Sequence, residues 1–223
     1  MNLDGFALPV KKLKGTDPVE TLDLSRKSLG VASAVVIASL FRVNGLLTVT
    51  NLLHNELDAE SAKMLAEVAK QKGMSLCGIQ RDQTTADFSK QSLNLPDAIL
   101  LASDLSQAVV TGALIRVDVC SNNIAGEGAE QLSAAVLGNL KIEMFNEILL
   151  KEMRANSITE LDLKGKGVGV EGVMVVAGLI PVMGALTSID LSSNQLTNYS
   201  KDMMGIKELA AALGANGALT NLK

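Results

Sequence analysis

"LTSIDLSSNQL", residues 186–196, places apolar side chains at Leu186, Ile189, Leu191 and Leu196, with Asn194 between the last two. This spacing fits neither the 3.6-residue period of a helix nor the plain alternation of a long strand. Alternation around Ile189 and Leu191 predicts a short strand with one buried side, followed by a turn that contains Asn194. The segment therefore raises the question of whether it is one unit of a repeat.

The pattern recurs along the chain, in each case before a helix-like segment. Residues 114–124, "LIRVDVCSNNI", keep all five positions, and residues 47–57 keep Asn55 but replace the fourth-place apolar residue with a threonine. Residues 19–29 and 158–168 keep the apolar positions and carry a lysine where the amide stands. Residues 83–93 are the weakest match. Starts at 19 and 47, and again at 158 and 186, are 28 residues apart.

The chain also contains a duplicated segment that is longer than a single repeat. Residues 19–46 and 158–185 are identical at 11 of 28 positions, and the preceding segments, "LPVKKLK" (8–14) and "ILLKEMR" (148–154), also correspond. Duplication of a stacking module explains this relation, whereas duplication of an active site does not.

These features resemble the leucine-rich repeat family in its ribonuclease-inhibitor-like form, with repeats of about 28 residues. The resemblance implies an α/β fold, a leucine-rich repeat solenoid (horseshoe) with parallel strands on the concave face and helices on the convex face. It also implies that Asn55, Asn122 and Asn194 satisfy backbone groups of adjacent turns, which Lys27 and Lys166 cannot do.

We expect a single domain over residues 1–223, because no Pro-rich or Gly/Ser-rich linker divides the chain. Residues 1–18 form an N-terminal lead-in or cap, and distorted turns begin with strands at "SLCGI" (75–79) and "KIEMF" (141–145). The repeats start near 19, 47, 83, 114, 158 and 186, and a partial repeat covers 219–223. That last unit lacks a turn and helix, which predicts that further repeats or another chain cover the C-terminal edge.

Composition excludes several classes of function. A net charge of −4 gives no electrostatic case for nucleic acid or anionic membranes, and aromatic residues make up only 2%, too few for stacking platforms. No apolar run is long enough for a membrane span or a signal peptide. Two cysteines, Cys77 and Cys120, are too few for a disulfide framework, and free thiols favour the cytoplasm.

Gly167-x-Gly169-x-x-Gly172 is the one motif that suggests an enzyme. It follows an expected strand, opens an expected helix and precedes Asp190, the outline of a nucleotide-binding turn. However, Val168 occupies the eleventh place of the repeat, which should point into the core. We therefore interpret the glycines as turn residues and expect no catalytic residue, no metal site and no cofactor.

Partner-binding residues are expected on either face. Aspartates fall at the fifth place of five repeats, which predicts an acidic column flanked by basic residues, although "LDL" is also ordinary usage at this place. The concave-face candidates are Asp23, Arg26, Asn51, His54, Asp87, Lys90, Arg116, Asp118, Asp162, Lys164 and Asp190. The convex-face candidates are four apolar residues at outward places of the duplicated helices, Val35, Val36, Met174 and Val175.

These observations favour a non-enzymatic scaffold that binds another protein, as a segment or subunit of a larger assembly. Two alternatives stay open at this stage. One is regulation of a small GTPase, since Ran GTPase-activating proteins have this repeat form. The other is a nucleotide-binding enzyme that uses Gly167, Gly169 and Gly172.

Overall fold

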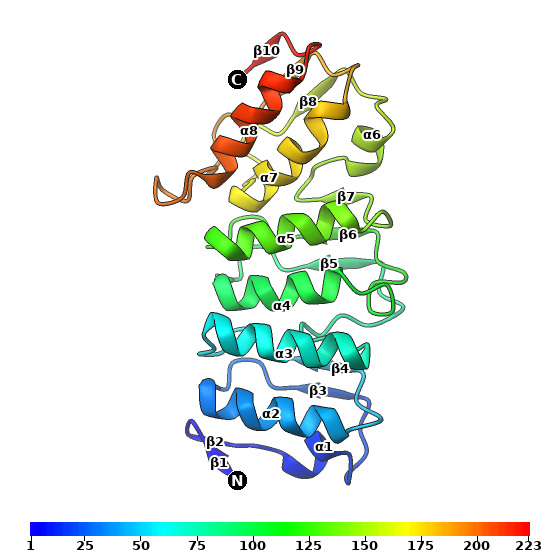
Figure 1. The fold of residues 1–223 in the computed structure, drawn as a ribbon, viewed down its shortest axis with the longest axis vertical. Helices are drawn as coiled ribbons and strands as arrows, with labels where there is room; N and C mark the ends of the chain where they lie inside the picture. Colours follow the sequence, from blue (N-terminus) through cyan, green and yellow to red (C-terminus); the bar gives the residue numbers. More distant parts are fainter. The chain divides into compact units, whose positions relative to one another are not determined.

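The computed structural model describes the whole chain, Met1–Lys223, and its strands and helices alternate along the sequence (Figure 1). The chain divides into two compact units. One unit holds residues 1–83 and 95–113, and the other holds residues 84–94 and 114–223. The expectation of a single domain stays a prediction. None of the helices combines the length and the apolar character needed to cross a membrane.

The first unit begins with an antiparallel hairpin, and its helices then follow one another in chain order. Helix α2 packs against α1 and α3, and α3 packs against α4 (Figure 1). The elements of this unit are β1 (Asn2–Leu3), β2 (Phe6–Ala7), α1 (Val10–Lys14), β3 (Thr21–Asp23), α2 (Val31–Val43), β4 (Val49–Asn51), α3 (Ala59–Lys72) and α4 (Leu95–Leu105).

The second unit has two three-stranded parallel sheets, ordered β5-β6-β7 and β10-β9-β8. Helix α7 packs against both α5 and α8. The elements are β5 (Thr85–Asp87), β6 (Arg116–Asp118), α5 (Gly126–Gly138), β7 (Met144–Phe145), α6 (Leu150–Arg154), β8 (Glu160–Asp162), α7 (Val170–Leu179), the 3-10 helix η1 (Ile180–Val182), β9 (Ser188–Asp190), α8 (Met204–Ala215) and β10 (Asn221–Leu222).

Strand pairing follows the repeat. Leu22 pairs with Thr50 and Leu161 with Ile189, so both pairs join residues 28 positions apart. After the β1–β2 hairpin, all pairs of strands are parallel, as expected for strands that return through a helical crossover. The prediction of an α/β fold with parallel strands is therefore confirmed.

Most side chains that the pattern places inward are buried, although Leu22 is half-buried and Leu222 of the last strand is exposed. Leu186, Ile189 and Leu191 of the opening segment are buried, as are Val117 and Leu161 at the centres of β6 and β8. Buried helix residues cover the same side of the strands. The core therefore lies between the strands and the helices, and residues on the other side of each strand are free to be polar.

Asn55 bonds to two successive repeats. Its side-chain oxygen accepts the backbone N–H groups of Lys27 and Leu29, both at 3.0 Å. Its amide nitrogen donates to the carbonyl oxygens of Leu24 and Leu52, at 2.9 and 2.8 Å. One carboxamide thus satisfies four backbone groups that no strand or helix pairs.

Asn122 and Asn194 act in the same way. The oxygen of Asn122 accepts the N–H groups of Gln91 and Leu93, and the nitrogen of Asn194 donates to the carbonyl of Leu163. In each case the amide reaches back to the preceding repeat. The role that the family resemblance implied for these asparagines is confirmed.

The distorted turn at 75–79 uses an aspartate from a neighbouring helix instead of an asparagine. Ser75 forms a parallel bridge with Val49, which places this segment beside β4. Asp104 of α4 accepts the hydroxyl of Ser75 at 2.7 Å and the N–H groups of Leu76 and Cys77 at 2.8 and 3.0 Å. Burial raises the pKa of Asp104 to about 6, against the opposing effect of these hydrogen bonds.

The duplication extends further than the sequence indicates. Helices α1 and α6 are both five residues long, and each follows a tight turn, between Leu3 and Phe6 and between Phe145 and Ile148. In the first copy Asp4 accepts the N–H groups of Gly30 and Ser33 at the start of α2. In the second copy the turn carries Asn146 instead, and the carboxylate at the corresponding start of α7 comes from Glu171.

Helix α7 lies unusually close to both of its neighbours because glycines stand at the contacts. A Cβ on Gly205 of α8 would lie 2.3 Å from Cγ1 of Val173 and 3.1 Å from the carbonyl oxygen of Val170. A Cβ on Gly178 of α7 would lie 2.6 Å from Cδ1 of Leu137 in α5. Close approach on both flanks buries most of α7.

We expect Gly205→Ala to lower the free energy of unfolding by about 1–3 kcal/mol, because the added methyl group overpacks the contact with Val173. Gly214 is the matched control on the same helix, since a Cβ there would meet nothing within 4 Å. At this position, Gly214→Ala should stabilise the protein by up to about 1 kcal/mol through helix propensity. Urea titrations measure both, and equal effects would contradict the close packing.

Candidate functional site

The aspartates at the strand ends form the first candidate surface. Asp23, Asp87 and Asp162 are exposed, whereas Asp118 and Asp190 are half-buried. In all five, a carboxylate oxygen accepts the backbone N–H two residues further on, at 2.8 to 3.0 Å. These local turns give each aspartate a structural role that does not depend on a partner.

Asn51 makes the same local bond, to the N–H of Leu53 at 3.1 Å. Strand register sets Asp23 beside Asn51 in the first unit. In the second unit it sets Asp87 beside Asp118, and Asp162 beside Asp190. Hydrogen bonds from Ser89 lower the pKa of Asp87, so this carboxylate stays ionised.

The basic candidates on this side occupy turns. Arg26, His54 and Lys90 have left-handed φ angles of 56°, 59° and 55° at the same place in three repeats. Lys164 is exposed, and Arg116 forms an ion pair with Glu147. The backbone N–H of His54 donates to Asp97 at 2.9 Å. A role in partner binding stays a prediction for all of these strand-side residues.

The glycine motif serves the turn into α7. Gly167 has a φ of 73°, and a Cβ at this position would lie 2.7 Å from Oγ of Ser121 in another repeat. Gly169 precedes the helix, and a Cβ there would lie 2.4 Å from the carboxylate of Glu171. The chain's own carboxylate therefore occupies the helix start that a phosphate would need.

The space beside the motif is also small. Gly167 and Gly169 line a cavity of about 150 Å³ together with Asn122 and Tyr199. Cavities that hold small molecules measure about 300–1,000 Å³. Val168 is fully buried, as the repeat predicts for its eleventh place. The structure therefore favours a structural role for these glycines over a nucleotide site.

Glu171 is a buried acid that the sequence does not single out. Asn146 donates to its carboxylate at 3.1 Å, and the oxygen of Asn146 accepts the N–H of Val119 at 2.8 Å. Burial raises the pKa of Glu171 to about 7, while its hydrogen bonds act in the opposite direction. Because both side chains are almost fully buried, this pair joins two repeats rather than facing a ligand.

Both cysteines are free and buried. Burial raises the pKa of the Cys77 thiol, and Asp104 adds to the effect. Burial likewise raises the pKa of Cys120, with Asp118 as the next cause. Neither thiol is activated as a nucleophile.

We expect both thiols of the native protein to react with a thiol reagent such as dithionitrobenzoate far more slowly than in urea. The reason is that the thiolate form is disfavoured and the sulfur atoms are shielded. Absorbance at neutral pH follows the reaction. A native thiol that reacts at the unfolded rate would show that its repeat is open.

The helix-side candidates differ in their exposure. Val35 is 48% exposed, and Val36 and Met174 are half-buried. The prediction that Val175 faces outward is wrong, because its side chain is 0% exposed. Helix α7 packs against both α5 and α8, and these neighbours cover Val175. On a helix with a neighbour on one side only, the same position would face solvent.

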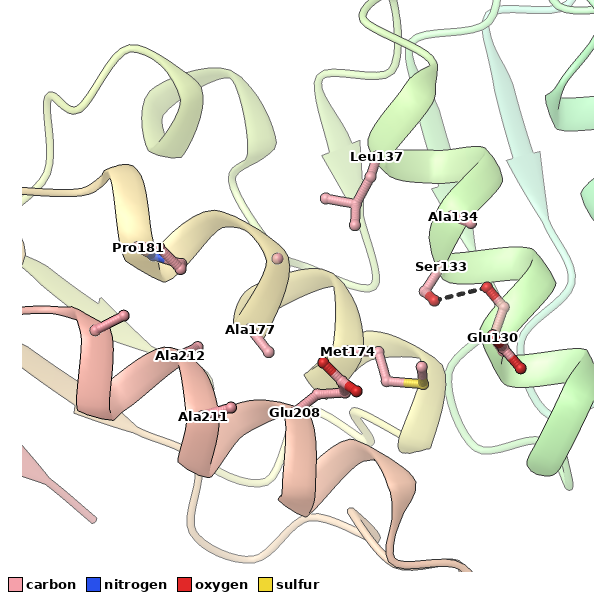
Figure 2. A pocket seen from close by; sticks show the side chains of 12 residues that line it. Glu130, Ser133, Ala134, Leu137, Met174, Ala177, Pro181, Glu208, Ala211 and Ala212 are labelled. Carbon is pink, nitrogen blue, oxygen red and sulfur yellow. Dashed lines mark hydrogen bonds between the residues drawn. The ribbon is translucent and has the colours of Figure 1, made fainter.

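Met174 lies in a groove on the helix side of the second unit (Figure 2). Helices α5, α7 and α8, together with η1, line it, and its volume is about 530 Å³. Four residues line it in each of three rows, from Glu130 to Leu137, from Met174 to Pro181 of η1 and from Glu208 to Ala215, and the ends of each row are seven residues apart. Such rows face one side of a helix and extend about 10 Å along it.

One end of the groove is acidic and the rest is apolar. Figure 2 shows Met174 between the side chains of Glu130 and Glu208, with Ala177 and Ala211 further along. Both glutamates are exposed, and neither forms an ion pair. Two carboxylates therefore stand unneutralised at the end of an apolar channel.

Asp202 ties together the two helices that flank this groove. One carboxylate oxygen accepts the N–H of Gly126 at the start of α5, at 2.6 Å. The other accepts the N–H of Met204 at the start of α8, at 2.8 Å. The side chain is only 9% exposed. It therefore fixes the spacing of α5 and α8 at the acidic end.

Comparison with known proteins adds distant likenesses only. No protein-family model matches the chain, and no curated protein matches it. A structure of leiomodin-1 actin-binding site 2 aligns over 92% of this chain and 88% of its own, with 13% identity and a TM-score of 0.33. An internalin of Listeria monocytogenes aligns over 95% of this chain, with 16% identity and a TM-score of 0.31. This chain spans 62% of that internalin.

Proposed function

We propose that this chain is a leucine-rich repeat protein of the ribonuclease-inhibitor-like form, a solenoid that acts as a non-enzymatic scaffold for another protein. The 28-residue strand register and the asparagine contacts between repeats support the repeat assignment. The reducing environment that suits its two free thiols supports a cytoplasmic location.

The observation that carries the scaffold proposal is the open groove between α5, α7 and α8. Polar side chains at the recurring motif positions are engaged by the backbone, as Asn55 and Asp23 illustrate. The groove, in contrast, exposes apolar side chains with carboxylates at one end, and exposed apolar patches with polar rims mark contact sites. The strand-side candidates are a second surface for the same partner.

Affinity capture with the full chain tests this function. The folded chain is immobilised beside a thermally unfolded sample of itself, and proteins from its native cells are quantified by mass spectrometry. We expect at least one protein to be enriched on the folded chain and to bind it again, once purified, with a dissociation constant in the micromolar range or tighter. The absence of any such protein would overturn the proposal.

A further inference from the structure

We propose that the groove between α5, α7 and α8 binds a short amphipathic helix of a partner protein, with Lys or Arg side chains at one end of its apolar face. This inference rests on the scaffold function and adds the chemistry of the partner. The groove is open to solvent and has a volume of about 530 Å³.

Shape argues for a helix as the occupant. Three helix segments each contribute four residues, the first and last of them seven residues apart, so the groove is about two helical turns long. Small residues on the two flanks, such as Ala134 and Ala211, leave room for side chains from another helix. A helix lays its apolar side chains, spaced three and four residues apart, into such a channel.

Charge argues for a basic end. Glu130 and Glu208 both lie at the Met174 end, from opposite flanks, and no lysine or arginine lines the groove (Figure 2). On the same helices, Glu127 is hydrogen-bonded to Gln131, and Glu171 is buried. A cation placed at this end meets two unpaired carboxylates, whereas an anion is repelled by both.

The flanks are held apart in advance. Because Asp202 bridges the N-terminal ends of α5 and α8, the acidic end does not need to rearrange when a partner enters. Gly178 sets the approach of α5 to α7 near the other end. Preorganisation of this kind lowers the cost of binding.

Methyl NMR on the full chain, labelled at its methionine methyl groups, tests the proposal. The probe is a synthetic 14-residue helical peptide with three leucines on one face and two lysines at one end of that face. We expect the Met174 methyl signal, assigned with Met174→Leu, to shift in a saturable way up to millimolar peptide. The same peptide with glutamates in place of the lysines should bind at least tenfold more weakly.

Charge reversal separates the groove from general electrostatics. In Glu130→Lys with Glu208→Lys, the lysine peptide should lose at least tenfold in affinity and the glutamate peptide should gain. The control, Glu20→Lys with Glu56→Lys, changes the net charge equally at exposed residues of the other unit and should behave as the wild type. Circular dichroism confirms that both variants fold.

Three results of the peptide experiments would overturn the inference. They are a Met174 signal that does not move at millimolar peptide, equal binding of the two peptides, and a Met174 signal that shifts with protein concentration alone. The last would assign the groove to a second copy of the chain. If affinity capture finds a partner that the charge-reversed variant still binds fully, the scaffold function stands and the groove inference fails.

Discussion

Asn55→Ala should lower the free energy of unfolding by about 3 kcal/mol, because it leaves several buried backbone groups without a partner. Asn55 is 8% exposed, and its carboxamide makes four hydrogen bonds to two repeats. Alanine makes none of them. Urea denaturation followed by circular dichroism measures the change.

Lys166→Ala is the matched control, since Lys166 occupies the corresponding place in another repeat and is exposed. We expect a change within about 0.5 kcal/mol, as for most surface substitutions. Asn122→Ala should fall between the two, at about 1–3 kcal/mol, because Asn122 makes equivalent bonds from a half-buried position. A larger effect at Lys166 than at Asn55 would show that the repeat register is wrong.

Stability should also fall as the pH rises from about 5 to 8, because Glu171 is more easily protonated in the folded state than in the unfolded state. Burial raises its pKa from 4.5 to about 7. The folded state therefore holds the proton through a range in which the unfolded state has lost it, so stability present below pH 4.5 is lost as the pH rises through 7. This rise in the pKa of Glu171 corresponds to a loss of about 3 kcal/mol in the free energy of unfolding across that pH range.

Glu171→Gln isolates this contribution, since glutamine keeps the shape and an acceptor for Asn146 but does not ionise. The variant should be less dependent on pH between about 6 and 8 than the wild type. Asp104, whose pKa is raised to about 6, adds a fall of the same sign at lower pH in both proteins. Identical profiles above about pH 6 would mean that Glu171 does not titrate as a buried acid. Thermal melts in matched buffers provide the comparison.

The sequence was sufficient for the parts of the fold that repeat. Alternating apolar residues around positions such as Leu161 and Ile189 predicted strands, and their spacing predicted the register that the structure shows. The sequence also predicted the role of Asn55, Asn122 and Asn194. An amide at this fixed position after a strand accepts a backbone N–H of the preceding repeat in each case.

The sequence was insufficient wherever contacts depend on a single repeat. Asp104 accepts hydrogen bonds from a turn 27 to 29 residues earlier in the chain. No sequence pattern around Asp104 indicates this contact. In the second copy, the hydrogen bond between Asn146 and Glu171 stands where the exposed Asp4 contacts Gly30 in the first copy. The sequences of the two turns do not match, so they do not predict this correspondence. Val175 was misplaced because periodicity gives the outward face of one helix but not the closeness of its neighbours.

The groove was only partly visible in advance. Met174 was a candidate, but the other lining residues, such as Ala134 on α5 and Ala211 on α8, are ordinary helix residues in sequence. Their common spacing of three and four residues was the available signal. This spacing indicates a groove only once the packing of the helices places the three rows side by side.

Native-state hydrogen exchange tests most directly the claim that the repeats are joined through their asparagines. The amides of Leu29, Leu93 and Val168 lie outside strands and helices, and each donates to an asparagine side chain. They should exchange as slowly as amides within the strands, and Asn55→Ala should remove protection at Leu29 while Leu93 keeps it. Rapid exchange at these three amides in the wild-type protein, at the rate of exposed loops, would contradict the account.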